Sequence, residues 1–312
     1  MGRVKVPVHP IIQRALRRAY HRGHHELPRR SLAEIRQYYE ETELPRLASP
    51  DYAEYQVLGA TLRLHCPIKT AKPLPVVIYF RASAYIFGNI DDTDYFAHHL
   101  AKYLKCIVAV IEPRRAPEYK FPIPFNDCIA GIHYLIEHHA KLQINPNKMA
   151  VWGESSGGNF AAAVCHYLKA EKVNNIGLQV LFYPMLDYYQ HHLYPSKQDF
   201  GEGFLMDKAL ADWFVAQYIT DPMQCQDPRI SPLLAENFEK LPQTLVIGAQ
   251  YDPMRDESCA YVEKLVKAKV PAKAFFLPGM IHGFLLYTSK LEAPRFAQRY
   301  AANFLKDGFL GL

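Results

Sequence analysis

A serine between two glycines stands where an apolar run gives way to a helical pattern. Gly153-Glu154-Ser155-Ser156-Gly157 follows the apolar residues 149–152 and precedes a helix-like stretch that starts at Asn159. A G-x-S-x-G motif at a strand-to-helix junction is typical of a nucleophile elbow, whose sharp turn projects the serine hydroxyl. Only small residues tolerate the close approach of strand and helix beside such a turn. Ser155 is therefore the candidate nucleophile; a glycine-rich loop with an ordinary surface serine is the alternative.

A serine hydroxyl is a poor nucleophile at neutral pH, so it needs a histidine base and a carboxylate that orients the histidine. Asp252 follows the apolar run 244–249, and Pro253 is suited to open the next helix and leave Asp252 on the strand-end loop. His282 lies in residues 278–284, which are expected to form a flexible loop that carries the imidazole over Ser155. These two residues are the candidate acid and base. Asp256 competes for the role of acid and is interpreted as a structural carboxylate at a helix N-terminus.

The rest of the chain predicts the scaffold that positions these residues. Two helical segments, near 10–22 and 31–42, precede an antiparallel hairpin pattern over 54–66. Apolar runs then alternate with helix-period stretches, which predicts βαβ units and a largely parallel sheet buried on both faces. Strands are expected at 75–80, 106–111, 148–152, 178–183, 244–249 and 274–277, and helices at 93–104, 124–140, 157–171, 255–268 and 291–306. A long segment after 183, with a helix near 207–218, is expected to be an inserted lid.

Length and composition suit one large α/β domain with an accessory cap, because 312 residues can bury a sizeable core. Every apolar stretch falls far below the roughly 20 residues that a membrane-spanning helix needs. The N-terminus leads into polar, histidine-rich sequence and has no apolar signal region, so the cytoplasm is the expected location. The six cysteines show no C-x-x-C pair or metal-ligand spacing. They are interpreted as reduced packing residues, and neither a metal nor another cofactor is expected.

The net charge of +5 belongs to the N-terminal segment, because residues 1–50 hold ten Lys and Arg against five Asp and Glu. Between Ile11 and Arg22, apolar residues, Tyr20 among them, repeat at helical spacing opposite arginines. A solvated cap helix is one interpretation, and peripheral attraction to an anionic lipid surface is the other. No nucleic-acid partner is expected, because no binding motif accompanies the charge. The histidines at 21, 24 and 25 lack partner ligands for a metal and are expected in a mobile, polar turn.

Together these motifs resemble the hormone-sensitive lipase-like esterases (the bacterial type) of the α/β-hydrolase superfamily. The resemblance is carried by residues 153–159, 252–257, His282-Gly283-Phe284, Arg114-Arg115-Ala116-Pro117-Glu118 with Phe121-Pro122, and Ser231-Pro232-Leu233. These segments span nearly the whole chain in the family's order, and Ser155, Asp252 and His282 follow the order of that superfamily. The resemblance implies an α/β-hydrolase fold with a mostly parallel eight-stranded sheet flanked by helices. Its core would comprise residues 51–186 and 226–312, and its helical cap residues 1–50 and 187–225.

The resemblance also implies a cofactor-free carboxylester hydrolase. His282 would deprotonate Ser155, Asp252 would hold the imidazole, and water would hydrolyse an acyl-enzyme. The expected substrate is a small-molecule ester with a short acyl chain. Amide hydrolysis and transacylation by the same three residues stay open, as does the oligomeric state, for which a homodimer is one alternative.

The resemblance fails at one loop, where the family has His-Gly-Gly-Gly and this chain has Arg81-Ala82-Ser83-Ala84. In the family this loop and the residue after the nucleophile bind the oxyanion, which assigns that role to the N–H groups of Ser83, Ala84 and Ser156. Glycine can hold a positive φ and lets an ester approach, whereas Cβ atoms here are expected to tilt the donors or crowd the site. A lost donor costs about 2.7–4 kcal/mol of transition-state stabilisation, so reduced activity is expected. The alternative is an impaired homologue that serves as a small-molecule binding protein.

Arg81 places a permanent cation where the family has an imidazole. A salt bridge to Asp91, Asp92 or Asp94 is the leading expectation, because cations near a cleft usually find protein partners. Contact with a substrate carboxylate or with the developing oxyanion is the alternative. Pro113 and Arg115 stand where the resemblance expects tyrosine and leucine, so the pocket wall beneath the loop is also expected to differ.

Overall fold

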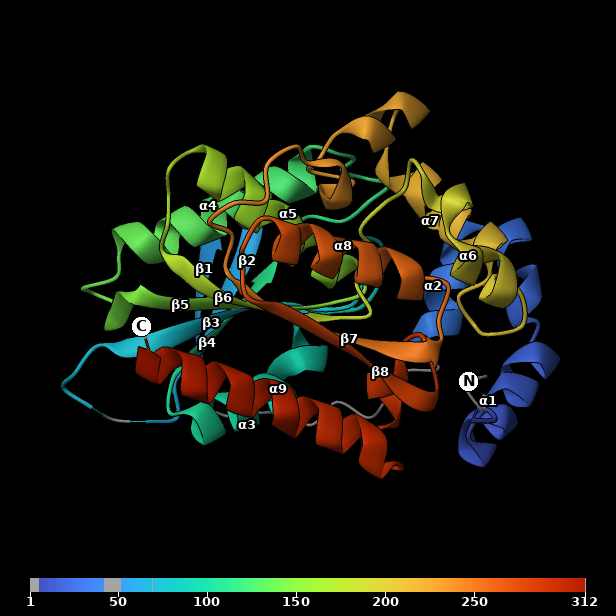
Figure 1. The fold of residues 1–312 in the computed structure, drawn as a ribbon, viewed down its shortest axis with the longest axis horizontal. Coiled ribbons are helices and arrows are strands. Elements are labelled where there is room, and N and C mark those ends of the chain that lie inside the picture. The colour runs from blue at the N-terminus through green and yellow to red at the C-terminus, as the bar shows by residue number, and fades with distance from the viewer. Residues whose placement is uncertain (1–5, 42–51, 69, 312) are drawn as a thin grey trace.

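An eight-stranded sheet forms the centre of the computed structural model, which describes residues 6–41, 52–68 and 70–311 (Figure 1). The strands are β1 (Ala53–Val57), β2 (Ala60–His65), β3 (Leu74–Phe80), β4 (Ile107–Glu112), β5 (Ile144–Glu154), β6 (Ile176–Phe182), β7 (Gln243–Tyr251) and β8 (Ala272–Ile281). Their spatial order is β1-β2-β4-β3-β5-β6-β7-β8. Strand β2 is antiparallel to β1 and β4, and the remaining pairs are parallel. The predicted hairpin and mostly parallel sheet are confirmed.

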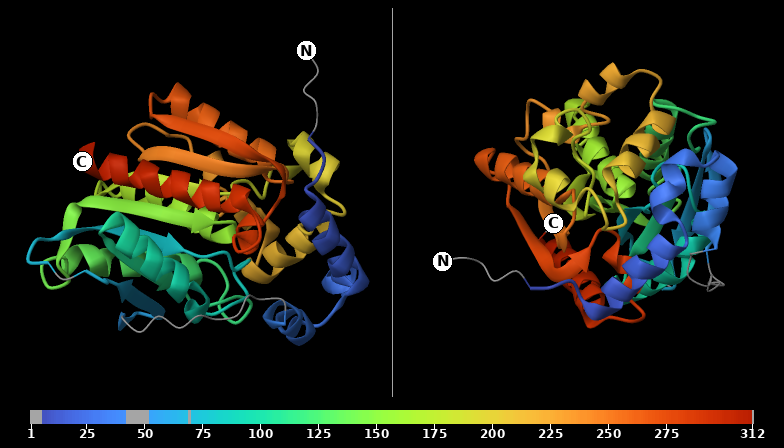
Figure 2. Two further views of the ribbon diagram at one scale, coloured as in Figure 1. Left: turned by 90° about the horizontal axis from the view of Figure 1, so that it is seen from below. Right: turned by 90° about the vertical axis from the view of Figure 1, so that its right-hand side faces the viewer.

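Helices cover both faces of the sheet (Figures 1 and 2). Helices α3 (Asp94–Leu104) and α9 (Glu292–Gly311) lie on one face, and α4 (Ile123–Glu137), α5 (Ser156–Ala170) and α8 (Arg255–Lys267) lie on the other. Alternate residues of β3 belong to two separate apolar clusters: Ile78 and Phe80 pack on one side, and Val77 and Tyr79 on the other. An apolar run buried on both faces is what a central parallel strand requires.

The spatial order of the strands brings two loops to one edge of the sheet. Strand β3 lies between β4 and β5, with Phe80 opposite Gly153 in the parallel β3–β5 register. The carboxyl ends of adjacent parallel strands meet at the same edge, where ligands bind in open α/β sheets. The segment that begins at Arg81 therefore lies beside the turn that contains Ser155.

Four further helices lie together beyond the carboxyl ends of the parallel strands (Figures 1 and 2). They are α1 (Pro10–His21), α2 (Leu32–Glu40), α6 (Pro195–Phe200) and α7 (Lys208–Tyr218). The first two come from the N-terminal segment, and the other two from the long connection between β6 and β7. The expected location of His24 in a mobile, polar turn is wrong, because its side chain is buried and its Nε2 lies 2.7 Å from the Leu205 carbonyl oxygen. This contact connects the N-terminal segment to the connection between β6 and β7, through residues 181 positions apart in the sequence.

Helix α1 is amphipathic, as its sequence predicts. Ile12 is buried, whereas Arg14, Arg17 and Arg18 are exposed. Tyr20 was expected on the apolar face, but its side chain is 63% exposed and stacks on His25 with ring centroids 4.4 Å apart. Of the helices that the structure describes, none has the length and apolar character needed to span a bilayer.

Strand β8 is longer than the sequence indicates. The expected flexible loop over 278–284 is wrong in its first half, because β8 continues to Ile281, which pairs with Tyr251 of β7. An irregularity in the register between Ala249 and Tyr251 accommodates Pro278 and Gly279, whose φ is +72°. Such a bulge lets a strand resume its pairing beyond residues that disfavour regular structure. His282 is therefore held directly at a strand end.

Candidate active site

Ser155 occupies a strained turn between β5 and α5. Its φ and ψ are 53° and −117°, a conformation that costs a residue with a side chain about 1–3 kcal/mol. The neighbouring glycines are required sterically. A Cβ atom at Gly157 would lie 2.1 Å from the Phe80 carbonyl oxygen, and one at Gly153 would lie 2.3 Å from the Gly157 carbonyl oxygen. The local chain therefore has the geometry of the nucleophile elbow that the motif predicts.

The structure brings the three candidate catalytic residues together. His282 Nε2 lies 2.9 Å from Ser155 Oγ, and His282 Nδ1 lies 3.1 Å from each carboxylate oxygen of Asp252. All three side chains are buried. A carboxylate can only accept hydrogen bonds, so Nδ1 carries the proton of the neutral imidazole and Nε2 is free to accept the serine proton.

Neighbouring groups fix the acid and the imidazole. The Met254 N–H donates to Asp252 Oδ1 at 2.8 Å, and the Tyr183 ring packs on His282 with centroids 4.9 Å apart. Asp256, the competing carboxylate, instead accepts from the Ser196 N–H at 2.8 Å and from Arg255 Nε at 2.9 Å. The carboxylate within reach of the imidazole is that of Asp252.

The loop after β3 adopts left-handed backbone without glycine. Ala84 and Tyr85 have φ values of 45° and 66°. The Ser83 N–H donates to Ser156 Oγ at 3.1 Å, and the two serine hydroxyl oxygens lie 3.3 Å apart. Within the described part of the chain, the N–H groups of Ala84 and Ser156 donate to no protein acceptor. Of the three N–H groups expected to bind an oxyanion, those of Ala84 and Ser156 are therefore free to donate, and that of Ser83 already donates to Ser156.

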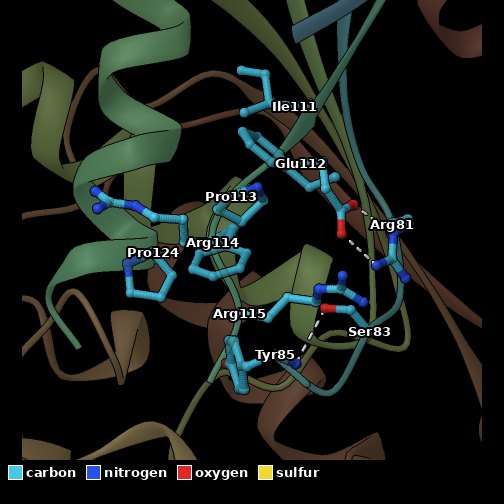
Figure 3. Close-up of a pocket in the computed structure, with 11 residues that line it drawn as sticks. Arg81, Ser83, Tyr85, Ile111, Glu112, Pro113, Arg114, Arg115 and Pro124 are labelled. Carbon is cyan, nitrogen blue, oxygen red and sulfur yellow. Dashed lines mark hydrogen bonds and ion pairs between the residues drawn. The ribbon is translucent and has the colours of Figure 1, made fainter. Parts of the chain in front are cut away.

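Arg81 forms a buried ion pair, but with a different carboxylate from those expected. Its Nε and one terminal nitrogen donate to the two carboxylate oxygens of Glu112, both at 2.6 Å (Figure 3). Asp91, Asp92 and Asp94 were expected as partners. Arg63 instead binds the first and the last of these, each at 2.8 Å. Glu112 ends β4, which pairs with β3, so the sheet brings it to Arg81 from 31 residues away in sequence.

The guanidinium of Arg81 also braces the loop. It donates to the Phe87 carbonyl oxygen at 2.6 Å and to the Ala82 carbonyl oxygen at 3.2 Å. Four of the five N–H groups of an arginine are thereby used, and Glu112 balances its charge. Arg81 has the contacts of a structural residue, and these do not favour the alternative in which it binds a substrate carboxylate.

A small cavity lies between this loop and the chain that follows β4 (Figure 3). Its volume is about 10 Å³, close to the space that one water molecule needs. Pro113 and Arg115 both line it, together with Arg81 and Tyr85, and neither Ser155 nor His282 does. Arg115 donates to the Gly88 carbonyl oxygen at 2.6 Å. The space beneath the loop therefore has room for about one water molecule.

Sequence reasoning missed one ionisable group beside the nucleophile. Burial raises the pKa of Glu154 to about 7, although Tyr79 Oη and Trp152 Nε1 donate to its carboxylate at 3.0 and 3.3 Å. The available signal was an acidic residue inside the elbow, preceded by a run of buried apolar residues. A carboxyl group there is largely removed from water, and its charged form is therefore disfavoured.

Comparisons with known proteins agree with this fold. A family model described as the alpha/beta hydrolase fold matches residues 77–286. The chain is 34% identical over 225 residues to an arylesterase from Saccharolobus solfataricus, covering 72% of each chain. It is 31% identical over 217 residues to an ethyl acetate hydrolase from Pseudomonas putida, covering 69% of this chain and 68% of that enzyme. An ester hydrolase structure from the metagenome of Lake Arreo has a TM-score of 0.88 at 30% identity and covers 97% of this chain and 99% of its own. The chain therefore belongs to the α/β-hydrolase family.

Proposed function

We propose that this protein is a serine carboxylesterase that hydrolyses esters of short acyl chains through an acyl-enzyme. The observation that carries the proposal is the continuous contact from Ser155 Oγ to His282 and from His282 to Asp252, built on a strained elbow. The same arrangement of residues also serves amide hydrolysis in other proteins, and amide hydrolysis and acyl transfer are the alternatives. The relatives named arylesterase and ethyl acetate hydrolase favour esters.

The proposed reaction uses the imidazole twice. His282 Nε2 takes the proton of Ser155 as Oγ attacks the ester carbonyl, and Asp252 stabilises the imidazolium that forms. The imidazolium then gives that proton to the departing alkoxide, which leaves as an alcohol. Water attacks the resulting acyl-enzyme with His282 again as base, so that the carboxylic acid is released and Ser155 regains its proton. The N–H groups of Ser156 and Ala84 would stabilise the oxyanion in both steps.

Aromatic side chains pack around the loop after β3. Tyr85 stacks on Tyr218 with ring centroids 4.0 Å apart and an interplanar angle of 5°. The Tyr85 and Tyr188 hydroxyl oxygens lie 2.8 Å apart, so a hydrogen bond fixes the first ring from its other end. This packing holds the loop in place, and the short acyl group of the proposed substrate is inferred from the relative named ethyl acetate hydrolase.

We also propose that residues 1–50 and 187–225 form a cap on a core of residues 51–186 and 226–312. The inserted segment is docked beside the acid of the site, because Ser196 Oγ donates to the Pro253 carbonyl oxygen at 2.9 Å. Residues 1–5 and 42–50 of this proposed cap lie outside the described residues.

Active-site labelling tests the proposed function. A fluorophosphonate probe should label the protein at Ser155, and p-nitrophenyl acetate should give a stoichiometric burst of nitrophenol. Ser155→Ala should abolish both, whereas Ser258→Ala, which alters another buried serine, should retain both. Because the proposed substrates have short acyl chains, kcat/KM should be higher for p-nitrophenyl acetate and butyrate than for p-nitrophenyl decanoate. Binding of the acetate ester with neither labelling nor burst would refute the esterase and favour the binding protein, which the engaged Ser83 N–H would then explain.

A further inference from the structure

The residue after the candidate nucleophile carries a hydroxyl group that faces the oxyanion loop. The Ser156 side chain is fully buried, and its Oγ accepts the Ser83 N–H at 3.1 Å. An N–H group has one proton, and hydrogen bonds weaken steeply when the donor is turned from its acceptor. The Ser83 N–H therefore cannot serve an oxyanion at full strength while Ser156 Oγ accepts it.

Both partners of this contact are held in place. Ser83 is fixed in a turn, because its carbonyl oxygen accepts the Ile86 and Phe87 N–H groups at 2.9 and 2.8 Å. Its hydroxyl accepts the Tyr85 N–H at 3.1 Å. Ser156 is held because α5 begins in close contact with the end of β3. Gly157, the next residue, has no room for a Cβ atom beside the Phe80 carbonyl oxygen. The backbone of neither element is free to separate Ser83 from Ser156.

We propose that the Ser156 hydroxyl occupies the third oxyanion donor, and that this side chain lowers the rate at which the ester reacts. The inference rests on the proposed esterase function. For the Ser83 N–H to act, Ser156 must rotate about χ1 and lose this hydrogen bond. Losing one hydrogen bond of ordinary net strength corresponds to about a 2–12-fold lower rate. If the buried side chain does not rotate, the whole donor is lost, which elsewhere corresponds to about 100–1000-fold.

Ser156→Ala removes the competing acceptor and leaves every backbone N–H in place. Its kcat for p-nitrophenyl acetate should rise at least about threefold with an unchanged KM, because an oxyanion donor acts on the transition state and not on the bound ester. Ser156→Cys should give a smaller rise, since sulfur is the weaker acceptor. Cys165→Ala is the matched control: it removes one heavy atom from a buried side chain of the same helix and should leave kcat unchanged.

Two further measurements separate this proposal from the esterase function. The amide proton of Ser83 should shift upfield in the NMR spectrum of Ser156→Ala, which reports the hydrogen bond without any need for turnover. Phenylboronic acid, which forms a tetrahedral adduct with a serine, should bind Ser156→Ala more tightly by the same factor as kcat rises. An unshifted Ser83 amide, or an equal or lower kcat in Ser156→Ala, overturns the proposal. Absence of fluorophosphonate labelling at Ser155 in the wild-type protein overturns the esterase function instead.

Discussion

Neutralising Glu112 tests whether its ion pair with Arg81 holds the loop after β3. The two side chains are 7% and 14% exposed and share two hydrogen bonds of 2.6 Å. Removing one partner of a buried pair costs about 3–5 kcal/mol, because the other charge stays desolvated. Coulomb's law agrees, since unit charges about 4 Å apart at an effective dielectric constant of 20 attract by about 4 kcal/mol. Glu112→Gln keeps one carbonyl acceptor, so we expect it to lower the free energy of unfolding by about 3 kcal/mol.

Urea unfolding at pH 7 measures this loss, and Glu118→Gln is the matched control. Glu118 also binds an arginine through both oxygens, with Arg36 at 2.7 and 2.8 Å, but its side chain is 50% exposed. An exposed pair contributes at most about 1 kcal/mol. A loss below about 1 kcal/mol for Glu112→Gln would refute the reasoning. The double variant Arg81→Met with Glu112→Leu should recover stability but not kcat, because an apolar pair fills the space without bracing the Ala82 and Phe87 carbonyl groups.

Two further predictions concern the elbow. The pKa of Glu154 is raised by burial from its ordinary value of 4.5 to about 7, so the folded state keeps a proton that the unfolded state releases, and stability falls as pH rises from 4.5 to 7. The stability of Glu154→Gln relative to the wild type should therefore rise by about 2.5 kcal/mol between pH 5 and pH 8 in urea unfolding, and an unchanged pH dependence would contradict this prediction. Gly157→Ala should lose fluorophosphonate labelling or fail to fold, because its Cβ atom would lie 2.1 and 2.4 Å from the Phe80 and Arg81 carbonyl oxygens. Gly311→Ala, with open space around its Cβ atom, should behave as the wild type in labelling and circular dichroism, and normal labelling of Gly157→Ala would contradict the steric argument.

The scaffold was predictable because its signals are local. Apolar runs marked the strands, and a glycine pair around Ser155 marked the turn, since both depend on residues close in sequence. The position of Asp252 at the end of an apolar run and before Pro253 indicated which carboxylate would meet His282. The sequence did not predict side-chain contacts that form only when strands pair in the sheet. Arg81 was assigned to acids about ten residues away, whereas its partner lies at the end of the neighbouring strand.

The sequence prediction ended β8 too early for a related reason. Pro278 and Gly279 disfavour regular strands, so sequence periodicity placed a loop there. The register irregularity in β7–β8 and the hydrogen bond from the Gly279 N–H to Gln250 Oε1, at 2.8 Å, depend on a strand that arrives from elsewhere in the chain. The consequence for the site is that His282 is anchored by pairing on its N-terminal side and needs no large movement to reach Ser155.

The loop after β3 holds positive φ values without glycine, and Arg81 offers a structural explanation. Ala84 and Tyr85 hold positive φ values, which cost a residue with a side chain about 1–2 kcal/mol each. The Arg81 guanidinium binds the carbonyl groups of Ala82 and Phe87, one on each side of those two residues. Charge-assisted hydrogen bonds of this kind, at about 1.5–3 kcal/mol each, are sufficient to offset that strain.

Hydrogen bonds from Arg81 therefore stabilise a turn that would otherwise favour glycine. The Arg81 hydrogen bonds hold the loop that contains Ala84, while the hydroxyl of Ser156 accepts the Ser83 N–H. The two effects act on adjacent peptide groups with opposite sign: loss of the brace should lower kcat, and loss of the hydroxyl should raise it. We therefore expect Arg81 and Ser156 to modulate the reactivity of Ser155 through the backbone beside it, whereas the reaction itself requires Ser155, His282 and Asp252.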